Sequence, residues 1–210
     1  MGITEKILKH ARMPKGRFGA FWVRTMNIGH GDVTRWGLSH ISINKDDTIL
    51  DIGCGGGKTV YTLATIATEG EVYGIDYSEV SVAVSTKINK RFIDAGRVKI
   101  SHASVDALPF SDDTFNFVIA VESYYFWPDL INNIKEIRRV LKPNGSVILI
   151  NAMYRDERFE KRNSYFARLG DFTYHLPKEF EVFLSDAGYS SIQIKVLEKK
   201  NWIAALGINR

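Results

Sequence analysis

The 210-residue chain has one cysteine, Cys54, and no hydrophobic run near the roughly 20 residues that a membrane-spanning helix needs. A single cysteine excludes an intrachain disulfide and a cysteine-cluster metal site, and no spacing of histidine with acidic residues is typical of a metal site. Residues 1–17 carry charges throughout and lack the apolar core of a signal peptide. We therefore expect a cytoplasmic protein without a bound metal.

The chain has only a small excess of positive charge, +4 in all, and this excess is concentrated near the N-terminus. Residues 1–45 hold eight lysines and arginines against two acids. Such a segment can meet a nucleic acid, a membrane surface or an acidic substrate, but a solvated helical face is the commoner explanation. Helices are expected over 3–12, 17–28 and 33–41, with Asp32 as the N-cap of the third. We predict that residues 1–45 form a helical arm or cap.

Strands and helices alternate through the larger domain predicted at residues 46–210. Buried strands are expected at 48–53, 71–78, 97–104, 114–123 and 146–152. Helices are expected at 58–68, after an N-cap at Ser78, after Pro128 and from Pro177. This alternation predicts an α/β fold, a doubly wound sheet of parallel strands. A charged aromatic stretch at 153–176 interrupts it as a lid-like helical insertion, and strands at 191–199 and 201–209 are expected to form an antiparallel pair.

A glycine-rich loop, "LDIGCGGGKT" at residues 50–59, follows the first predicted strand. Such a loop brings a ligand close to the backbone at the carboxyl end of a strand. A triphosphate-binding loop would need its first glycine at position 52, which is Ile52. A dinucleotide loop would need its third glycine at position 58, which is Lys58. Neither phosphate-binding pattern is complete.

Asp51 precedes the loop and favours a different ligand. A carboxylate at this place repels phosphate and suits a cation, and S-adenosylmethionine carries an ammonium and a sulfonium but no phosphate. Asp76 lies 23 residues after Gly53, at the end of the second predicted strand. An acid at about this distance can accept hydrogen bonds from both ribose hydroxyls. The next residue, Tyr77, is placed to cover the adenine face.

Four segments together carry a resemblance to a known family: "ILDIGCGGG", "GIDYS", "LPFSDDTFNFVIAVES" and "EIRRVLKPNGSVILI". In this order and spacing, over roughly residues 45–200, the chain resembles class I S-adenosylmethionine-dependent methyltransferases. The similarity is to the small-molecule branch that includes enzymes of ubiquinone and menaquinone biosynthesis. The resemblance implies a Rossmann-like doubly wound sheet of seven strands, with helices on both faces and the last strand antiparallel.

The resemblance also implies roles for individual residues. Asp51, Gly53 and Gly55 would form the methionine side of the cofactor pocket, and Asp76 would hold the ribose. The amide of Val105 would donate to the adenine ring, while either Ser104 or Asp106 would meet the exocyclic amine. Glu122, at the end of the fourth strand, would lie beside the transferable methyl group, and the product would be S-adenosylhomocysteine.

The methyl acceptor is less defined by the sequence. Aromatic residues after the fourth strand and a Gly, His and Trp-rich stretch of the arm indicate a small, partly apolar or aromatic molecule, bound by His30, Trp36, Tyr124, Tyr125 and Trp127. The chain lacks the Pro-Pro-aromatic segment of base amino-methyltransferases, which disfavours a nucleic-acid acceptor. Glu122, Tyr124 and His30 are candidate general bases, and no catalytic residue is assigned.

Two rival functions remain open at this point. A non-catalytic protein could use the same pocket to sense S-adenosylmethionine, with the basic arm as its interaction surface. An NAD-dependent oxidoreductase could use the glycine loop for a dinucleotide. The sequence does not indicate an oligomeric state.

Overall fold

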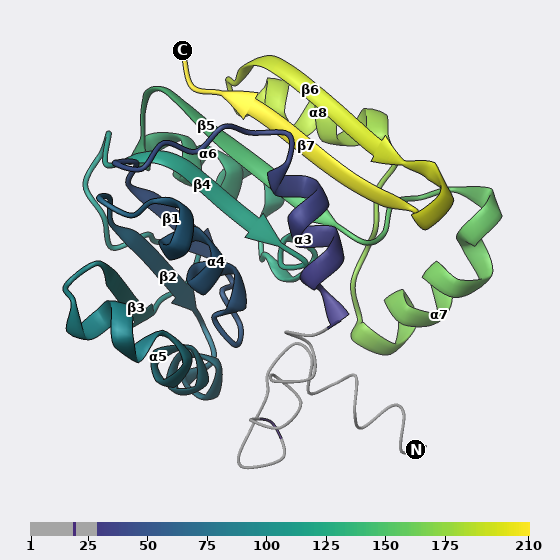
Figure 1. Ribbon diagram of the computed structural model, residues 1–210. Coiled ribbons are helices and arrows are strands. Elements are labelled where there is room, and N and C mark those ends of the chain that lie inside the picture. The colour runs from purple at the N-terminus through teal and green to yellow at the C-terminus, as the bar shows by residue number, and fades with distance from the viewer. Residues whose placement is uncertain (1–18, 20–28) are drawn as a thin grey trace.

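The computed structural model describes residue 19 and residues 29–210 of the chain (Figure 1). The helices expected over 3–12 and 17–28 lie outside the described residues, apart from Gly19. Among the described residues, no helix is long and apolar enough to cross a membrane, and no group of three or more histidine, cysteine or acidic side chains could hold a metal ion.

Seven strands form one sheet in the order β3-β2-β1-β4-β5-β7-β6. The strands are β1 (Ile49–Ile52), β2 (Val72–Asp76), β3 (Val98–His102), β4 (Phe115–Val121), β5 (Leu141–Asn151), β6 (Ser190–Leu197) and β7 (Trp202–Ile208). The first five pair in parallel, whereas β7 is antiparallel to both β5 and β6. The predicted Rossmann-like sheet with an antiparallel last strand is therefore confirmed.

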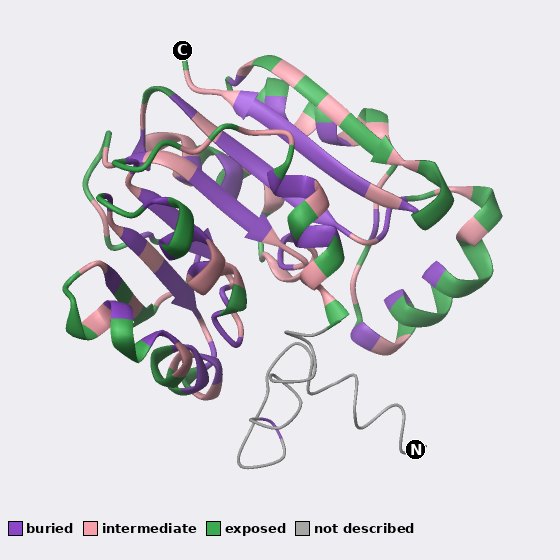
Figure 2. Ribbon diagram, in the orientation of Figure 1, coloured by how far each residue is buried: buried purple, intermediate pink, exposed green. Residues whose placement is uncertain are grey.

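Helices cover both faces of the sheet (Figure 1). One buried cluster joins the sheet to α3 (Gly31–Leu38), α4 (Lys58–Ile66) and α5 (Glu79–Asp94). The other joins it to α6 (Leu130–Val140) and α8 (Pro177–Asp186). Because apolar helix faces are buried on both sides, all four residues of β1 are buried, whereas edge strand β6 alternates toward solvent (Figure 2).

The predicted insertion at 153–176 contains α7 (Glu160–Gly170) and the short helix η2 (Glu157–Phe159). Two more single turns occur in the described chain, η1 (Tyr124–Phe126) after β4 and η3 (Glu198–Lys200) before β7.

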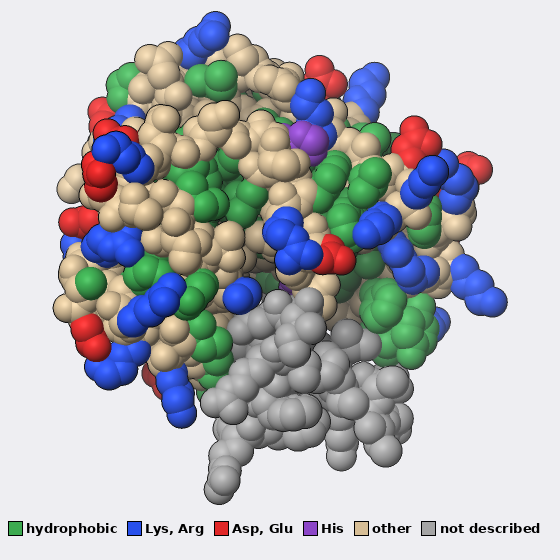
Figure 3. Space-filling view, viewed as in Figure 1, with side chains coloured by type: hydrophobic (Ala, Val, Ile, Leu, Met, Phe, Trp, Pro, Cys, Tyr) green, Lys and Arg blue, Asp and Glu red, His purple; other side chains and the backbone are tan. Residues whose placement is uncertain are grey.

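On the face shown in Figure 3, basic and acidic side chains are interspersed over the surface.

Three local expectations need correction, and one at Ser78 is confirmed. Asp32 lies in the first turn of α3, which begins earlier because the Thr34 N–H and hydroxyl both donate to the carbonyl of His30. Pro128 does not open α6; the side chain of Asp129 caps that helix by accepting from the Asn132 N–H. Strand β5 begins at Leu141, five residues before the strand expected at 146–152. Ser78 caps α5 as predicted.

Candidate cofactor and acceptor site

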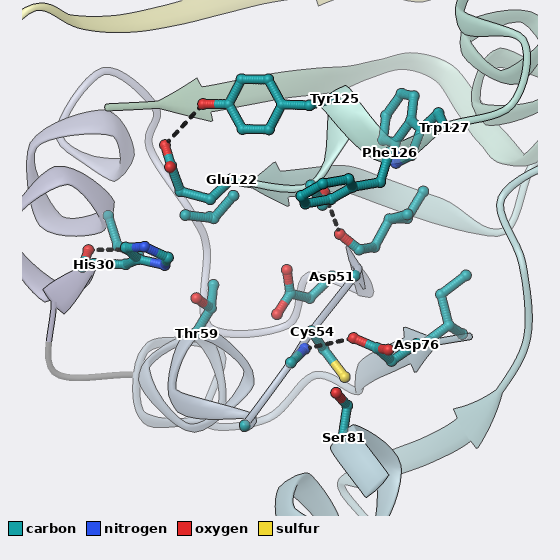
Figure 4. Close-up of a pocket in the computed structure, with 18 of the residues that line it drawn as sticks. His30, Asp51, Cys54, Thr59, Asp76, Ser81, Glu122, Tyr125, Phe126 and Trp127 are labelled. Carbon is teal, nitrogen blue, oxygen red and sulfur yellow. Dashed lines mark hydrogen bonds between the residues drawn. The ribbon is translucent and has the colours of Figure 1, made fainter. Parts of the chain in front are cut away.

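A cavity of about 1040 Å³ lies at the carboxyl ends of three adjacent strands, β2, β1 and β4. Each of these strands brings one acid to the cavity wall, namely Asp76, Asp51 and Glu122 (Figure 4). Helix α3, the start of α4, the segments after β3 and β4 and the 153–176 insertion also contribute to the wall. The topology thus brings together acids that are as much as 71 residues apart in the sequence.

The glycine loop is folded tightly against its neighbours. Gly53 has φ +71°, and a Cβ atom added there would lie 2.5 Å from the Cβ of Ser123. The N–H groups of Gly53 and Cys54 both donate to the carbonyl of Ile75, each at 2.9 Å. A side chain at position 53 would therefore meet both a left-handed backbone and a steric clash, which explains the glycine.

Asp76 is buried at the end of β2 and is held by two backbone groups. The Gly55 N–H donates to its Oδ2 at 2.9 Å, and the Ser78 N–H donates to its Oδ1 at 2.8 Å. Burial raises the pKa of Asp76, although these two hydrogen bonds oppose the shift. Since each carboxylate oxygen has more than one lone pair, both oxygens can still accept from a ligand.

Asp51 is only 1% exposed, and its Oδ2 has no hydrogen-bond partner among the described residues. Burial, together with the nearby Asp76 carboxylate, raises the pKa of Asp51 to about 8. A buried carboxyl group without a partner is costly, and a cationic ligand in the cavity would offset that cost. An anionic phosphate would increase it. The site therefore fits the charge of S-adenosylmethionine and not that of a pyrophosphate.

The structure places three of the four residues expected near adenine on the cavity wall. Tyr77, Ser104 and Val105 lie on the cavity wall. Asp106 is exposed and does not contribute to that wall. Of the two candidates for contact with the exocyclic amine, Ser104 is the one that faces the cavity.

The opposite half of the cavity is aromatic. The ring centroid of Tyr125 lies 4.8 Å from that of Phe172, and Phe126 meets Phe172 edge-to-face at 5.6 Å. Trp127 also lines the wall, as expected. The Tyr125 hydroxyl donates to Oε1 of Glu122 at 3.2 Å, so this acid faces the aromatic half.

Two of the expected acceptor residues do not line the cavity. Trp36 packs against Trp202, with ring centroids 6.0 Å apart, because it lies two residues beyond Thr34 and so points away from the cavity side of α3. Tyr124 is 2% exposed and packs edge-to-face on Phe180 in the core. His30, at the start of α3, does lie on the wall.

Several wall residues were not singled out from the sequence. The insertion contributes four of them: Met153, Arg162, Phe166 and Phe172. Arg162 and Phe166 are four residues apart on α7 and so share one helix face, a spacing that was available as a signal. Lys58 and Thr59 at the start of α4 also line the cavity.

Comparison with known proteins agrees with this geometry. Residues 50–149 match the family model described as a methyltransferase domain. The chain carries a class I S-adenosylmethionine-dependent methyltransferase domain. The glycine loop after β1 and the acid at the end of β2 both lie within the matched residues.

The methyltransferase domain has relatives with assigned names. A demethylmenaquinone methyltransferase of Geobacillus kaustophilus is 33% identical over 115 residues, which cover 54% of this chain and 48% of the relative. An uncharacterized methyltransferase of Bacillus subtilis is 28% identical over 134 residues, covering 63% of this chain and 72% of the relative. The matched part thus spans about half the length of the demethylmenaquinone methyltransferase.

A solved structure shows the same fold over almost the whole chain. The S-adenosylmethionine-dependent methyltransferase from Aquifex aeolicus superposes with a TM-score of 0.71 at 18% identity, covering 91% of this chain and 98% of that one. S-adenosylmethionine is the cofactor of the methyltransferase domain. Two features of this chain fit that cofactor. The Oδ2 atom of Asp51 has no hydrogen-bond partner among the described residues, and both carboxylate oxygens of Asp76 can accept hydrogen bonds from a ligand.

Proposed function

We propose that this chain transfers the methyl group of S-adenosylmethionine to a small, partly apolar or aromatic molecule by in-line displacement at the methyl carbon. The observation that carries the proposal is the single cavity in which a cofactor half, built around Asp51 and Asp76, continues into an aromatic half built around Tyr125 and Phe172. A donor and an acceptor can therefore bind next to each other in one enclosure.

On the cofactor side, each residue has a chemical task. Asp76 accepts hydrogen bonds from the ribose hydroxyls, and Asp51 balances the cationic amino-acid end. Gly53 and Gly55 let the backbone approach that end closely. The Val105 amide and the Ser104 hydroxyl are placed to meet the adenine edge. When bound, the cofactor supplies an activated methyl group with a good leaving group already attached.

On the acceptor side, the chain mainly positions the acceptor and excludes water. Holding two reactants in a reactive geometry can lower a barrier by several kcal/mol, about 7 to 11 in favourable cases. Tyr125, Phe126, Trp127 and Phe172 offer flat apolar surface, which suits a planar ring. That some relatives are named demethylmenaquinone methyltransferases supports a quinone-like or other aromatic acceptor for this chain.

Two segments would shape the acceptor half. We assign the 153–176 insertion the role of a lid, because Arg162 and Phe172 stand on the cavity wall. We assign the 1–45 arm the role of a cap, since its described part places His30 and Thr34 on the same wall.

The test has two stages. Calorimetry with S-adenosylmethionine, S-adenosylhomocysteine and NAD separates a methyltransferase from an oxidoreductase; tight binding of NAD alone would refute the proposal. Incubation of the protein with methyl-labelled S-adenosylmethionine and a protein-free extract of source cells then separates an enzyme from a sensor. We expect transfer of label to a small aromatic product, and cofactor binding without any labelled product would indicate a sensor.

A further inference from the structure

Glu122 has a backbone conformation that its residue type avoids. Its φ is +53°, in the left-handed region that a residue with a Cβ atom rarely adopts. Its N–H donates to the Ile150 carbonyl at 3.0 Å, so β5 holds the backbone in place. A residue kept in such a conformation at the edge of a cavity points to a use for its side chain.

The carboxylate of Glu122 is fixed through one oxygen only. Its Oε1 accepts from the Tyr125 hydroxyl at 3.2 Å and from the backbone N–H of Ala152. Burial and the neighbouring Glu122 raise the pKa of Tyr125 well above its usual value, so this hydroxyl keeps its proton and donates. The Oε2 atom has no hydrogen-bond partner among the described residues, and Glu122 lines the cavity.

A fixed positive charge faces this carboxylate from α7. The guanidinium of Arg162 interacts electrostatically with Glu122 and Tyr125 and also lines the cavity. Asn163 and Asn201, both fully buried, accept from Arg162 Nη2 at 2.9 Å and 2.7 Å and so hold it. Among the described residues, the titratable and charged groups that interact electrostatically with Glu122 are Tyr125 and Tyr124 from η1 and Arg162 from α7.

From this geometry we infer that Oε2 of Glu122 accepts the proton of a hydroxyl group on an aromatic methyl acceptor that lies against Tyr125 and Phe172. The inference rests on the proposed function and narrows the acceptor to a hydroxylated ring. An ionised carboxylate only accepts hydrogen bonds, so it selects a donor group on the ligand. A neutral hydroxyl is a weak nucleophile and gains most from losing its proton during attack.

The step balances in atoms and electrons. The acceptor oxygen forms a bond to the methyl carbon, the carbon–sulfur bond of the donor breaks with its electron pair remaining on sulfur, and the hydroxyl proton passes to Glu122. Of the two roles that the sequence leaves open for Glu122, a place on the cofactor side and a general base, the inference assigns it the second.

The first experiment measures binding alone. In the presence of S-adenosylhomocysteine, calorimetry compares 1-naphthol with 1-methoxynaphthalene, which has the same ring but no hydroxyl proton. We expect the wild-type protein to prefer 1-naphthol about tenfold or more, on the scale of a hydrogen bond to a charged group. In Glu122→Gln this ratio should fall by about threefold or more, while affinity for S-adenosylhomocysteine stays within about threefold.

Glu160→Gln is the matched control. Glu160 also accepts from a tyrosine hydroxyl, that of Tyr174 at 2.8 Å, but it does not line the cavity. This variant should keep the wild-type ratio. If the wild-type protein binds both probes equally, or binds neither, the inference is wrong, and this result does not depend on whether Glu122→Gln folds.

The second experiment measures turnover with methyl-labelled S-adenosylmethionine and the protein-free extract as the source of acceptor. Loss of a general base lowers rates by about 10²–10⁴-fold. Glu122→Gln should therefore slow labelling by about a hundredfold or more, and Glu160→Gln should not. Normal labelling by Glu122→Gln overturns the inference but leaves the proposed function intact, whereas absence of labelling by the wild-type protein counts against the proposed function itself.

Discussion

The pH dependence of cofactor affinity is the sharpest consequence of the buried Asp51. In the ligand-free protein the pKa of this carboxyl group is about 8, because it is 1% exposed and close to Asp76. A bound cation favours the ionised form, so binding must release the proton whenever the group is protonated beforehand. Affinity should then follow the ionised fraction of Asp51.

The magnitude follows from that pKa. The ionised fraction rises from about one in a hundred at pH 6 to about one half at pH 8, provided that the pKa in the complex lies below 6. Affinity for S-adenosylmethionine should rise about fiftyfold over this range, which is about 2.3 kcal/mol, and level off above pH 8. Calorimetry in buffers of different ionisation enthalpy should also detect the release of nearly one proton at pH 6.

Two controls isolate Asp51 in this experiment. Asp51→Asn cannot ionise and should bind S-adenosylmethionine weakly with little dependence on pH. The ligand 5′-methylthioadenosine has neither the ammonium nor the sulfonium, so its affinity for the wild-type protein should change little between pH 6 and pH 8. If the wild-type affinity for S-adenosylmethionine is flat over this range, or if Asp51→Asn keeps the slope, Asp51 is not the partner of the cation.

Three further predictions concern the same residues. Asp76→Ala should weaken S-adenosylmethionine binding by about 1–3 kcal/mol, measured by calorimetry, and unchanged affinity would remove its ribose role. Gly53→Ala should lower the free energy of unfolding more than Gly96→Ala does. Both glycines have positive φ, but only a Cβ atom at position 53 would meet a neighbour, Ser123. Equal losses of unfolding free energy, measured by urea denaturation, would contradict the steric argument. In the ligand-free wild-type protein, the pKa of Asp51 is raised above its unfolded value of 3.8, so the protein loses stability as pH rises toward 8. Asn cannot ionise, so the stability of Asp51→Asn relative to the wild-type protein should increase from pH 5 to pH 8. The increase should be at most about 1.4 kcal/mol per pH unit. A stability difference that is independent of pH would argue against a buried, uncompensated carboxyl group.

The parts of the site that depend on local pattern could be predicted from the sequence. Asp51 and Asp76 end buried strands that stand out by apolar composition, and a parallel sheet brings such ends to one edge. The glycines mark a turn that only they can adopt. Ser78 was predicted as a helix cap because capping depends on a few neighbouring residues.

The parts that depend on long-range packing could not be predicted. Phe172 meets Tyr125 across 47 residues of chain, and nothing near either residue indicates the partner. Residue type alone makes Trp36 and Tyr124 candidates for acceptor binding. Whether each side chain reaches the cavity depends on the side of its helical turn on which it lies. Tyr124 is buried in the core and Trp36 is half-buried against Trp202, because burying large aromatic surface is favourable in itself.

The most direct test of the central claim is a crystal structure of the protein grown with both S-adenosylhomocysteine and NAD at equal concentration. We predict S-adenosylhomocysteine in the cavity, with its ammonium beside the Asp51 carboxylate and its ribose hydroxyls on Asp76. A dinucleotide whose pyrophosphate oxygens lie against the amides of residues 55–57 would contradict the account.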